Sequence, residues 1–271
     1  NIKLKIISYK KTSTVTHAME AVSAVKMRKG QERALSARPY ARAALRILSS
    51  LSGSMNLLHH PLTTERKEGK VAIVIITSDK GLAGGLNSSV IKKAELFIRD
   101  HGLTREDVVF LCLGKRGYEF ALNHGYEVVH HELNIADTID EREFHAITDQ
   151  VLALYGRGDA REVRVAYTDF KSTFEQEAAI HKILPLSQKV LEHIVLSIKP
   201  LRGKYSDILN GNGNGAPTYT VEPSEEEVLS ALLPRLVNIA IFHKLLESKA
   251  SEHSARMVAM KSGTDKAKEM A

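Results

Sequence analysis

The sequence predicts an α/β fold with long helices: an antiparallel coiled coil of the N- and C-terminal helices with an inserted Rossmann-like parallel-sheet domain. Apolar residues recur at steps of three and four near both ends of the 271-residue chain. Between them, short β-branched runs alternate with helical segments. Two long helices at opposite ends of one chain pair most simply with each other, which leaves the alternating region as a domain between them.

The N-terminal helix is predicted over residues 1–55. Its most regular apolar stripe is Val15, Ala18, Val22 and Val25, and we expect this narrow face to contact the C-terminal helix. Pro39 interrupts the pattern and predicts a kink, and Gly53 is a plausible end.

The central α/β domain is predicted over residues 68–200. A continuous apolar run such as Val71–Thr77 is typical of a parallel strand buried on both faces. Four further strands are expected, at Val108–Leu113, Glu127–His131, Val163–Thr168 and Ala178–Leu186, with helices near 88–101, 115–124 and 140–155. Residues 201–223 include the run Asn210–Gly215 and are interpreted as a flexible linker and foot segment.

The C-terminal helix is predicted over residues 224–271. Ser224 can cap it, and Glu227 occupies the capping-box position. More than five heptads follow, which argues for a coiled coil over an ordinary helix bundle. The predicted seam, with Leu246 and Met257 buried against the N-terminal helix, is Leu229, Leu232, Leu236, Ile239, His243, Leu246, Ala250, His253, Met257, Met260, Thr264 and Ala267.

Charge is unevenly distributed along the chain. Residues 1–50 carry eleven Lys or Arg and two Glu, whereas the whole chain has a net charge of only +6. A basic arm on a mildly acidic body indicates a negatively charged partner. A basic coiled-coil nucleic-acid-binding protein is the alternative function, although Tyr40 is the only aromatic residue near the basic positions that could stack on bases.

The sequence offers no convincing catalytic or metal site. The turn Gly81–Asn87 follows a strand and precedes a helix, but its glycine spacing matches neither nucleotide-binding fingerprint, so a tight structural turn is the simpler interpretation. The single cysteine, Cys112, lies in an apolar strand and is expected to be buried and inert. We therefore expect no enzymatic activity, no cofactor and no metal, and we expect no segment to span a bilayer.

Three segments resemble the gamma subunit family of rotary F-type ATP synthases, in the bacterial type. Residues 16–33 with 36–41 resemble its N-terminal helix, 77–87 its strand and glycine turn, and 250–262 its C-terminal signature. They occur in the family's order and cover both helices and the domain between them. Departures are Ala83, where many members carry Cys, and Val221, where an aromatic residue is frequent.

The resemblance implies a non-catalytic central stalk that couples rotation of a proton-driven c-ring to ATP synthesis. It implies the alpha and beta subunits of a surrounding ring, the epsilon subunit and the c-ring as partners, and no nucleic acid. It also implies a peripheral position on the cytoplasmic side of a bacterial inner membrane, with the matrix side of the mitochondrial inner membrane as the alternative.

Partner-contact residues follow from the same resemblance. A basic collar is expected to meet an acidic segment of beta, with Met19 nearby on the matching motif. Glu252 and Arg256 match polar shaft positions that face the ring, and Tyr219 and Glu222 match a foot segment that contacts the c-ring. The collar consists of Lys26, Arg28, Lys29 and Arg33.

Overall fold

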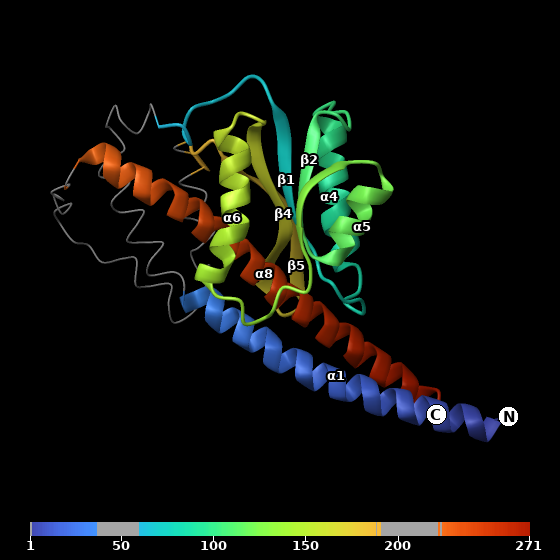
Figure 1. The fold of residues 1–271 in the computed structure, drawn as a ribbon. Helices are drawn as coiled ribbons and strands as arrows, with labels where there is room; N and C mark the ends of the chain where they lie inside the picture. Colours follow the sequence, from blue (N-terminus) through green and yellow to red (C-terminus); the bar gives the residue numbers. More distant parts are fainter. Residues whose placement is uncertain (1, 37–59, 188, 191–221, 223) are drawn as a thin grey trace.

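The computed structural model describes residues 2–36, 60–187, 189–190, 222 and 224–271. It confirms the predicted fold class: a sheet with helices on both faces is joined to a pair of long antiparallel helices (Figure 1). The expected kink at Pro39, the helix end at Gly53 and the linker residues 201–221 lie outside the described residues.

The elements follow the predicted order. They are α1 (Ile2–Ser36), β1 (Lys70–Ile76), α4 (Leu86–Asp100), β2 (Val108–Leu113), α5 (Lys115–Asn123), β3 (Glu127–Glu132), α6 (Glu141–Gly156), β4 (Ala160–Ser172), β5 (Glu175–Leu184) and α8 (Glu225–Glu269).

The sheet has the strand order β3-β2-β1-β4-β5. Strands β1 to β4 are mutually parallel, as predicted, whereas β5 runs antiparallel to β4 with Val165 opposite His181. This last strand departs from the predicted parallel-sheet arrangement. Only Thr173 and Phe174 separate β4 from β5, and so short a connection can form a hairpin but not a parallel crossover.

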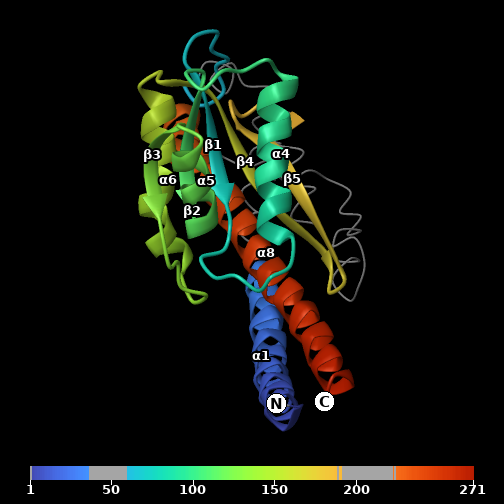
Figure 2. The ribbon, with the colours of Figure 1, turned by 90° about the vertical axis from the view of Figure 1, so that its right-hand side faces the viewer.

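Two helical layers cover the sheet, which explains why its central strands are apolar on both faces. Helices α4 and α5 pack on one face, where Phe97 and Phe120 join Phe110 of β2 in one cluster. Helices α6 and α8 pack on the other face, where Phe144 and Phe242 lie 5.3 Å apart between ring centroids. Figure 1 shows the sheet nearly edge-on, with α6 on one side and α4 and α5 on the other, and Figure 2 shows it from the α4 side with α8 crossing behind.

The first half of α8 is a layer of the α/β domain and not only a coiled-coil strand. Every residue from Leu236 to Leu246 is buried, so this stretch contacts neighbours all around its circumference. The heptad interpretation is thus wrong for Leu229–Ile239, whose apolar residues belong to the sheet core. By length and composition part of α8 could cross a membrane, but 67% of that stretch is buried inside the chain, as in the core helix of a folded domain.

The second half of α8 pairs with α1 and forms, with it, a two-helix shaft. Thr16 and Thr264 share a hydrogen bond of 2.7 Å across the pair. About four helical turns away, a Cβ on Gly30 would lie 3.5 Å from Ala250. Both contacts fit one antiparallel register, so the helices stay in step over this length. The shaft projects from the α/β domain with both termini at its far end (Figure 1).

Candidate functional site

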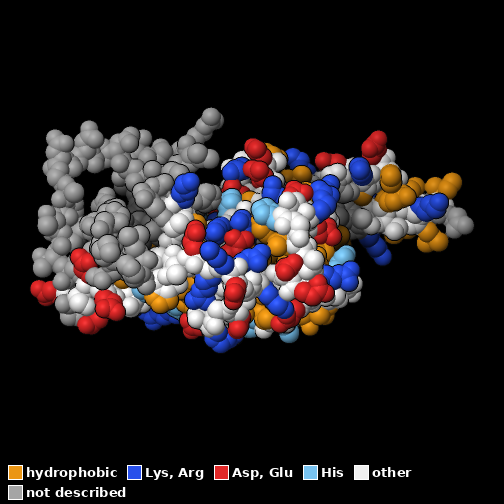
Figure 3. All heavy atoms as spheres, turned by 90° about the horizontal axis from the view of Figure 1, so that it is seen from above, with side chains coloured by type: hydrophobic (Ala, Val, Ile, Leu, Met, Phe, Trp, Pro, Cys, Tyr) orange, Lys and Arg blue, Asp and Glu red, His pale blue; other side chains and the backbone are white. Residues whose placement is uncertain are grey.

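The stripe of valines on α1 faces away from α8. Val15, Val22 and Val25 are 57–58% exposed, and Ala18 is exposed as well. We call these four residues the outer stripe. The expectation that they form the seam with α8 is wrong. Figure 3 shows further hydrophobic side chains at the projecting end of the shaft, where Ile2, Leu4 and Ile7 are exposed.

Small and polar residues of α1 form the actual seam. Ser13, Ser23 and Ala34 are buried, and Gly30 lies against Ala250. Small side chains let two backbones approach closely, and the threonine pair at positions 16 and 264 satisfies its own hydroxyls. The apolar partners come from α8, where the predicted seam from Leu246 to Ala267 is buried apart from Met257, which is half-buried.

Two residues of the basic collar point away from the chain, and the other two contact the α/β domain. Arg28 is exposed and pairs with Glu32 of its own helix at 3.3 Å, and Lys29 is also exposed. Lys26 instead reaches Asp137 at 2.9 Å, and Arg33 donates to backbone carbonyls of residues 137–139. A helix turns 100° per residue, so a run of nearby charges cannot all face one partner. Their roles as partner contacts stay predictions.

Glu252 and Arg256 face the α/β domain. They form an ion pair of 2.6 Å, and the Arg256 guanidinium, 8% exposed as a residue, donates to the carbonyl of Gly81 at 3.3 Å. Arg256 thus ties α8 to the glycine turn, and Glu252 pairs with it. Contact of these two residues with a surrounding ring stays a prediction. Of the remaining predicted residues, Met19 is half-buried and Glu222 is exposed, while Tyr219 lies outside the described residues.

The glycine turn is a structural connection, as the sequence suggested. Thr77 Oγ1 accepts from the Gly117 amide at 2.8 Å, and Asp79 accepts from the Lys115 amide at 2.9 Å, so both side chains satisfy the N-terminus of α5. Ser78 donates its amide to the Asn87 side chain at 2.9 Å. These polar side chains are occupied by the fold itself.

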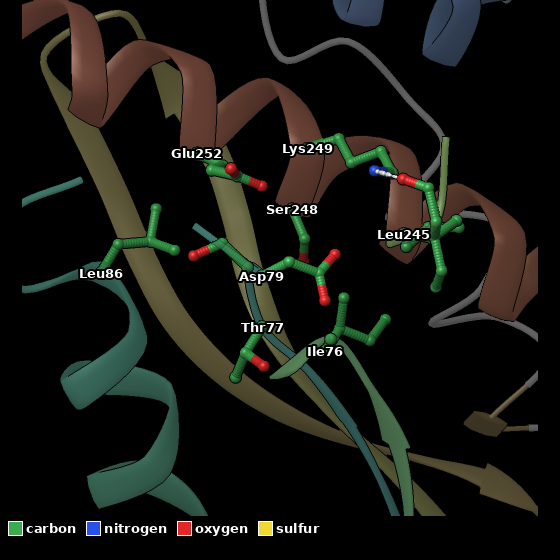
Figure 4. A pocket seen from close by; sticks show the side chains of 11 residues that line it. Ile76, Thr77, Asp79, Leu86, Leu245, Ser248, Lys249 and Glu252 are labelled. Carbon is green, nitrogen blue, oxygen red and sulfur yellow. Dashed lines mark hydrogen bonds between the residues drawn. The ribbon is translucent and has the colours of Figure 1, made fainter. Parts of the chain in front are cut away.

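Helix α8 crosses the end of the sheet where doubly wound domains bind ligands. That place is the edge at the carboxyl ends of the parallel strands. Here Ser248 and Glu252 of α8 lie around a cavity with Thr77 and Asp79 (Figure 4), and its volume is about 20 Å³. That is room for about one water molecule. Among the residues that the structure describes, this cavity is far too small for a nucleotide.

Other chemistry-bearing residues are also in structural positions. Within the described ranges, no group of three His, Cys, Asp or Glu could hold a metal ion. Burial raises the pKa of the Cys112 thiol to about 12, so it stays protonated and inert. Lys244 is buried beneath Tyr167, with its Nζ 3.3 Å from the phenol oxygen, and burial lowers the pKa of this lysine.

Sequence reasoning missed Asp137, which joins both shaft helices to the α/β domain. Its carboxylate lies 2.9 Å from Lys26, 3.1 Å from His253 and 3.4 Å from Lys249. The close contact with His253, together with the hydrogen bond from Lys26, holds the pKa of Asp137 well below its usual range in spite of partial burial. A lone acid in the otherwise uncharged run Asn134–Ile139 was the available signal.

Comparison with known proteins identifies the family. A family model described as ATP synthase matches residues 1–271. An ATP synthase gamma chain of Heliobacterium modesticaldum is 36% identical over all of this chain and 88% of its own length. The gamma chain of Geotalea uraniireducens is 33% identical over all of this chain and 87% of its own length.

Solved structures share the fold at lower identity. The central stalk and c-ring structure of the Tetrahymena thermophila mitochondrial ATP synthase contains a chain with a TM-score of 0.63 and 22% identity, covering 92% of this chain and 98% of that one. A rotor structure from Euglena gracilis has a TM-score of 0.61 and 14% identity, covering 99% and 91%. Together with the full-length sequence relatives, these findings show that the chain belongs to the family of ATP synthase gamma chains.

Proposed function

We propose that this chain is the central rotor stalk of an F-type ATP synthase and couples rotation of a proton-driven c-ring to ATP synthesis in a surrounding ring of alpha and beta subunits. The observation that carries the proposal is the projecting shaft. A 35-residue helix runs antiparallel to the end of a 45-residue helix, which is itself built into the α/β domain. Torque applied to the domain therefore enters the shaft through one continuous helix.

The outer stripe suits a face that turns against other subunits. Its apolar side chains make no hydrogen bonds, so contact with a surrounding ring would favour no single rotational position. Exposed apolar side chains gathered on one face are typical of a partner surface. The outward charges of Arg28 and Lys29 lie beside this stripe on the same helix and suit an acidic segment of the beta subunits.

The chain is a non-catalytic component of its complex, and its structure supplies the reason. The crevice at the strand ends, where a doubly wound domain would bind a nucleotide, is filled by α8 and by the side chains of the glycine turn. Nucleotide chemistry then belongs to other subunits. The alternative of a nucleic-acid-binding protein finds no support among the relatives.

The partners follow from the family and from the assemblies to which the structural neighbours belong. One neighbour is a central stalk with its c-ring, and another belongs to an assembly of OSCP, F1 and c-ring. By analogy we assign this chain alpha and beta subunits around the shaft, and an epsilon subunit and c-ring at the end of the molecule opposite the shaft tip. Glu222 and Tyr219 remain the proposed c-ring contacts. The bacterial relatives favour a peripheral position on the cytoplasmic side of an inner membrane.

The test measures ATP hydrolysis and proton pumping together in membrane vesicles that carry the assembled complex. Reversing the two outward collar charges with Arg28→Glu and Lys29→Glu should leave hydrolysis in place and lower the number of protons pumped per ATP. Partly exposed charge pairs contribute only about 0–1 kcal/mol each, so both are reversed at once.

The matched control reverses Lys92 and Lys93, an adjacent exposed pair on α4 away from the shaft. The control should keep the wild-type pumping ratio. An unchanged ratio in the collar variant at both low and moderate salt would show that the collar is only a solvated face. Failure of the wild-type chain to assemble with alpha and beta subunits would contradict the proposed function itself.

A further inference from the structure

The segment Ile135–Ile139 connects β3 to α6 and lies against both helices of the shaft. Asp137 is its one charged residue. The segment contacts α1 through Lys26 and Arg33 and α8 through Lys249 and His253. We call this set the Asp137 junction.

The contacts with α1 combine a charge with several carbonyls. Lys26 Nζ donates to Asp137 Oδ2 at 2.9 Å. Two turns further along the helix, Arg33 donates to the carbonyl of Thr138 at 3.1 Å and also to the carbonyls of Asp137 and Ile139. These polar side-chain contacts join α1 to the α/β domain.

The contacts with α8 use the same carboxylate. Lys249 Nζ donates to the carbonyl of Ile135 at 2.6 Å and lies 3.4 Å from Asp137 Oδ1. His253 Nε2 lies 3.1 Å from that oxygen. His253 and Lys249 are mostly buried, so this half of the junction is shielded from solvent and from screening by salt.

The junction lies at a close approach of the two helices. Gly30 lies between Lys26 and Arg33 on α1, and it faces Ala250, which lies between Lys249 and His253 on α8. A glycine opposite an alanine permits close approach but provides almost no side-chain interlocking. Something other than the seam must therefore resist sliding or rolling of α1 at this level. The residues of the junction lie on both sides of the Gly30–Ala250 contact along each helix.

We propose that the Asp137 junction is a three-way lock that fixes the axial and rotational register of α1 against α8 and the α/β domain, and that it transmits torque from the domain to α1. Asp137 is in this sense a positioning residue. The register part concerns the chain alone, whereas the torque part rests on the proposed rotor function.

Hydrogen exchange of the full-length isolated chain tests the register part. Asp137→Asn keeps the shape of the side chain and removes its charge. Backbone amides of α1 around Gly30 should then exchange about fivefold to tenfold faster, the size expected for losing one typical intramolecular hydrogen bond. Amides of β1 and α4 should keep their wild-type rates. Asp159→Asn, which removes an exposed partner of Arg157 far from the shaft, is the matched control.

Two outcomes would overturn the register part. One is unchanged exchange in α1, and the other is an equal acceleration in α1, β1 and α4, which would mean that Asp137 stabilises the whole fold. Lys26→Met adds an independent check, because its effect should largely disappear when Asp137→Asn is already present.

Vesicles carrying the assembled complex test the torque part. Asp137→Asn should lower the number of protons pumped per ATP hydrolysed, and Asp159→Asn should not. A normal ratio in Asp137→Asn, with faster exchange of α1 in the isolated chain, rejects torque transmission and retains the lock. Failure of the wild-type chain to support any pumping rejects the proposed function instead, so the two failures are distinguishable.

Discussion

Replacing three valines of the outer stripe by serine tests whether this face of α1 contacts other subunits and not the rest of its own chain. Val15, Val22 and Val25 are mostly exposed in the chain, so Val→Ser at all three should change its own stability little. Serine and valine have similar helix propensities, so α1 itself should also be unaffected. The effect is expected when the shaft enters a ring of alpha and beta subunits.

The size of the effect follows from the area still available for burial. Fully burying a valine contributes about 1.5–3 kcal/mol. Each of the three retains 57–58% of its exposure, which leaves about 1–1.5 kcal/mol per residue. Because area converts incompletely into affinity, we expect a total loss of about 2–4 kcal/mol, or roughly 30-fold to 1000-fold weaker association.

The assay titrates the chain against a ring of alpha and beta subunits that lacks it and measures the dissociation constant. Leu122→Ser on α5, an exposed apolar residue of the α/β domain away from the shaft, is the control. The reasoning is refuted if the triple variant binds within twofold of that control. It is also refuted if urea unfolding of the isolated triple variant shows a clear loss of stability, since the valines would then be packed within the chain.

Three further predictions concern the shaft and its junction. Leu246→Ala should lower the free energy of unfolding by about 2–5 kcal/mol in urea titration, because Leu246 is buried where α8 meets both the sheet core and α1; a change below 1 kcal/mol would place it outside the core. Gly30→Ala should raise the free energy of unfolding by up to about 1 kcal/mol, since its added methyl would make an ordinary contact with Ala250. Gly30→Leu should lower it by about 1–3 kcal/mol, and a stabilising Leu would show that the helices are not in close contact there. The folded-state pKa of Asp137 lies below that of an unfolded aspartate, about 3.9. Its contribution to stability is therefore present above that pH and is lost as the pH falls below it. The stability difference between wild type and Asp137→Asn should shrink from about pH 6 toward about pH 3, and a constant difference would contradict the ion-pair assignment.

Much of the architecture is determined locally and could be predicted from sequence alone. The run Val71–Thr77 is β-branched and apolar on both faces, and it is β1 at the centre of the sheet. The Ser224 cap and the acids that follow it mark the start of α8, where Ser224 accepts from the Glu227 amide at 3.2 Å. The glycine turn was recognisable as structural because its spacing fails the nucleotide fingerprints.

Tertiary structure decided what covers each face. A period of three and four residues shows that a helix has an apolar face, but it does not show whether that face is covered by the same chain or left for a partner. On α1 the valines were left exposed and the small residues were buried, because close approach of two backbones requires small side chains at the seam. On α8 the residues of one continuous pattern pack against the sheet in the first half of the helix and against α1 in the second half.

Contacts between residues distant in sequence were likewise beyond local patterns. Arg256 turned inward because its helix crosses the sheet end beside the carbonyl of Gly81, a neighbour that no spacing reveals. Asp137 gains its role only because α1 and α8 both pass beside its segment. Local sequence patterns determined the elements and their order. Packing decided which charged side chains contact the rest of the chain and which remain available to other subunits.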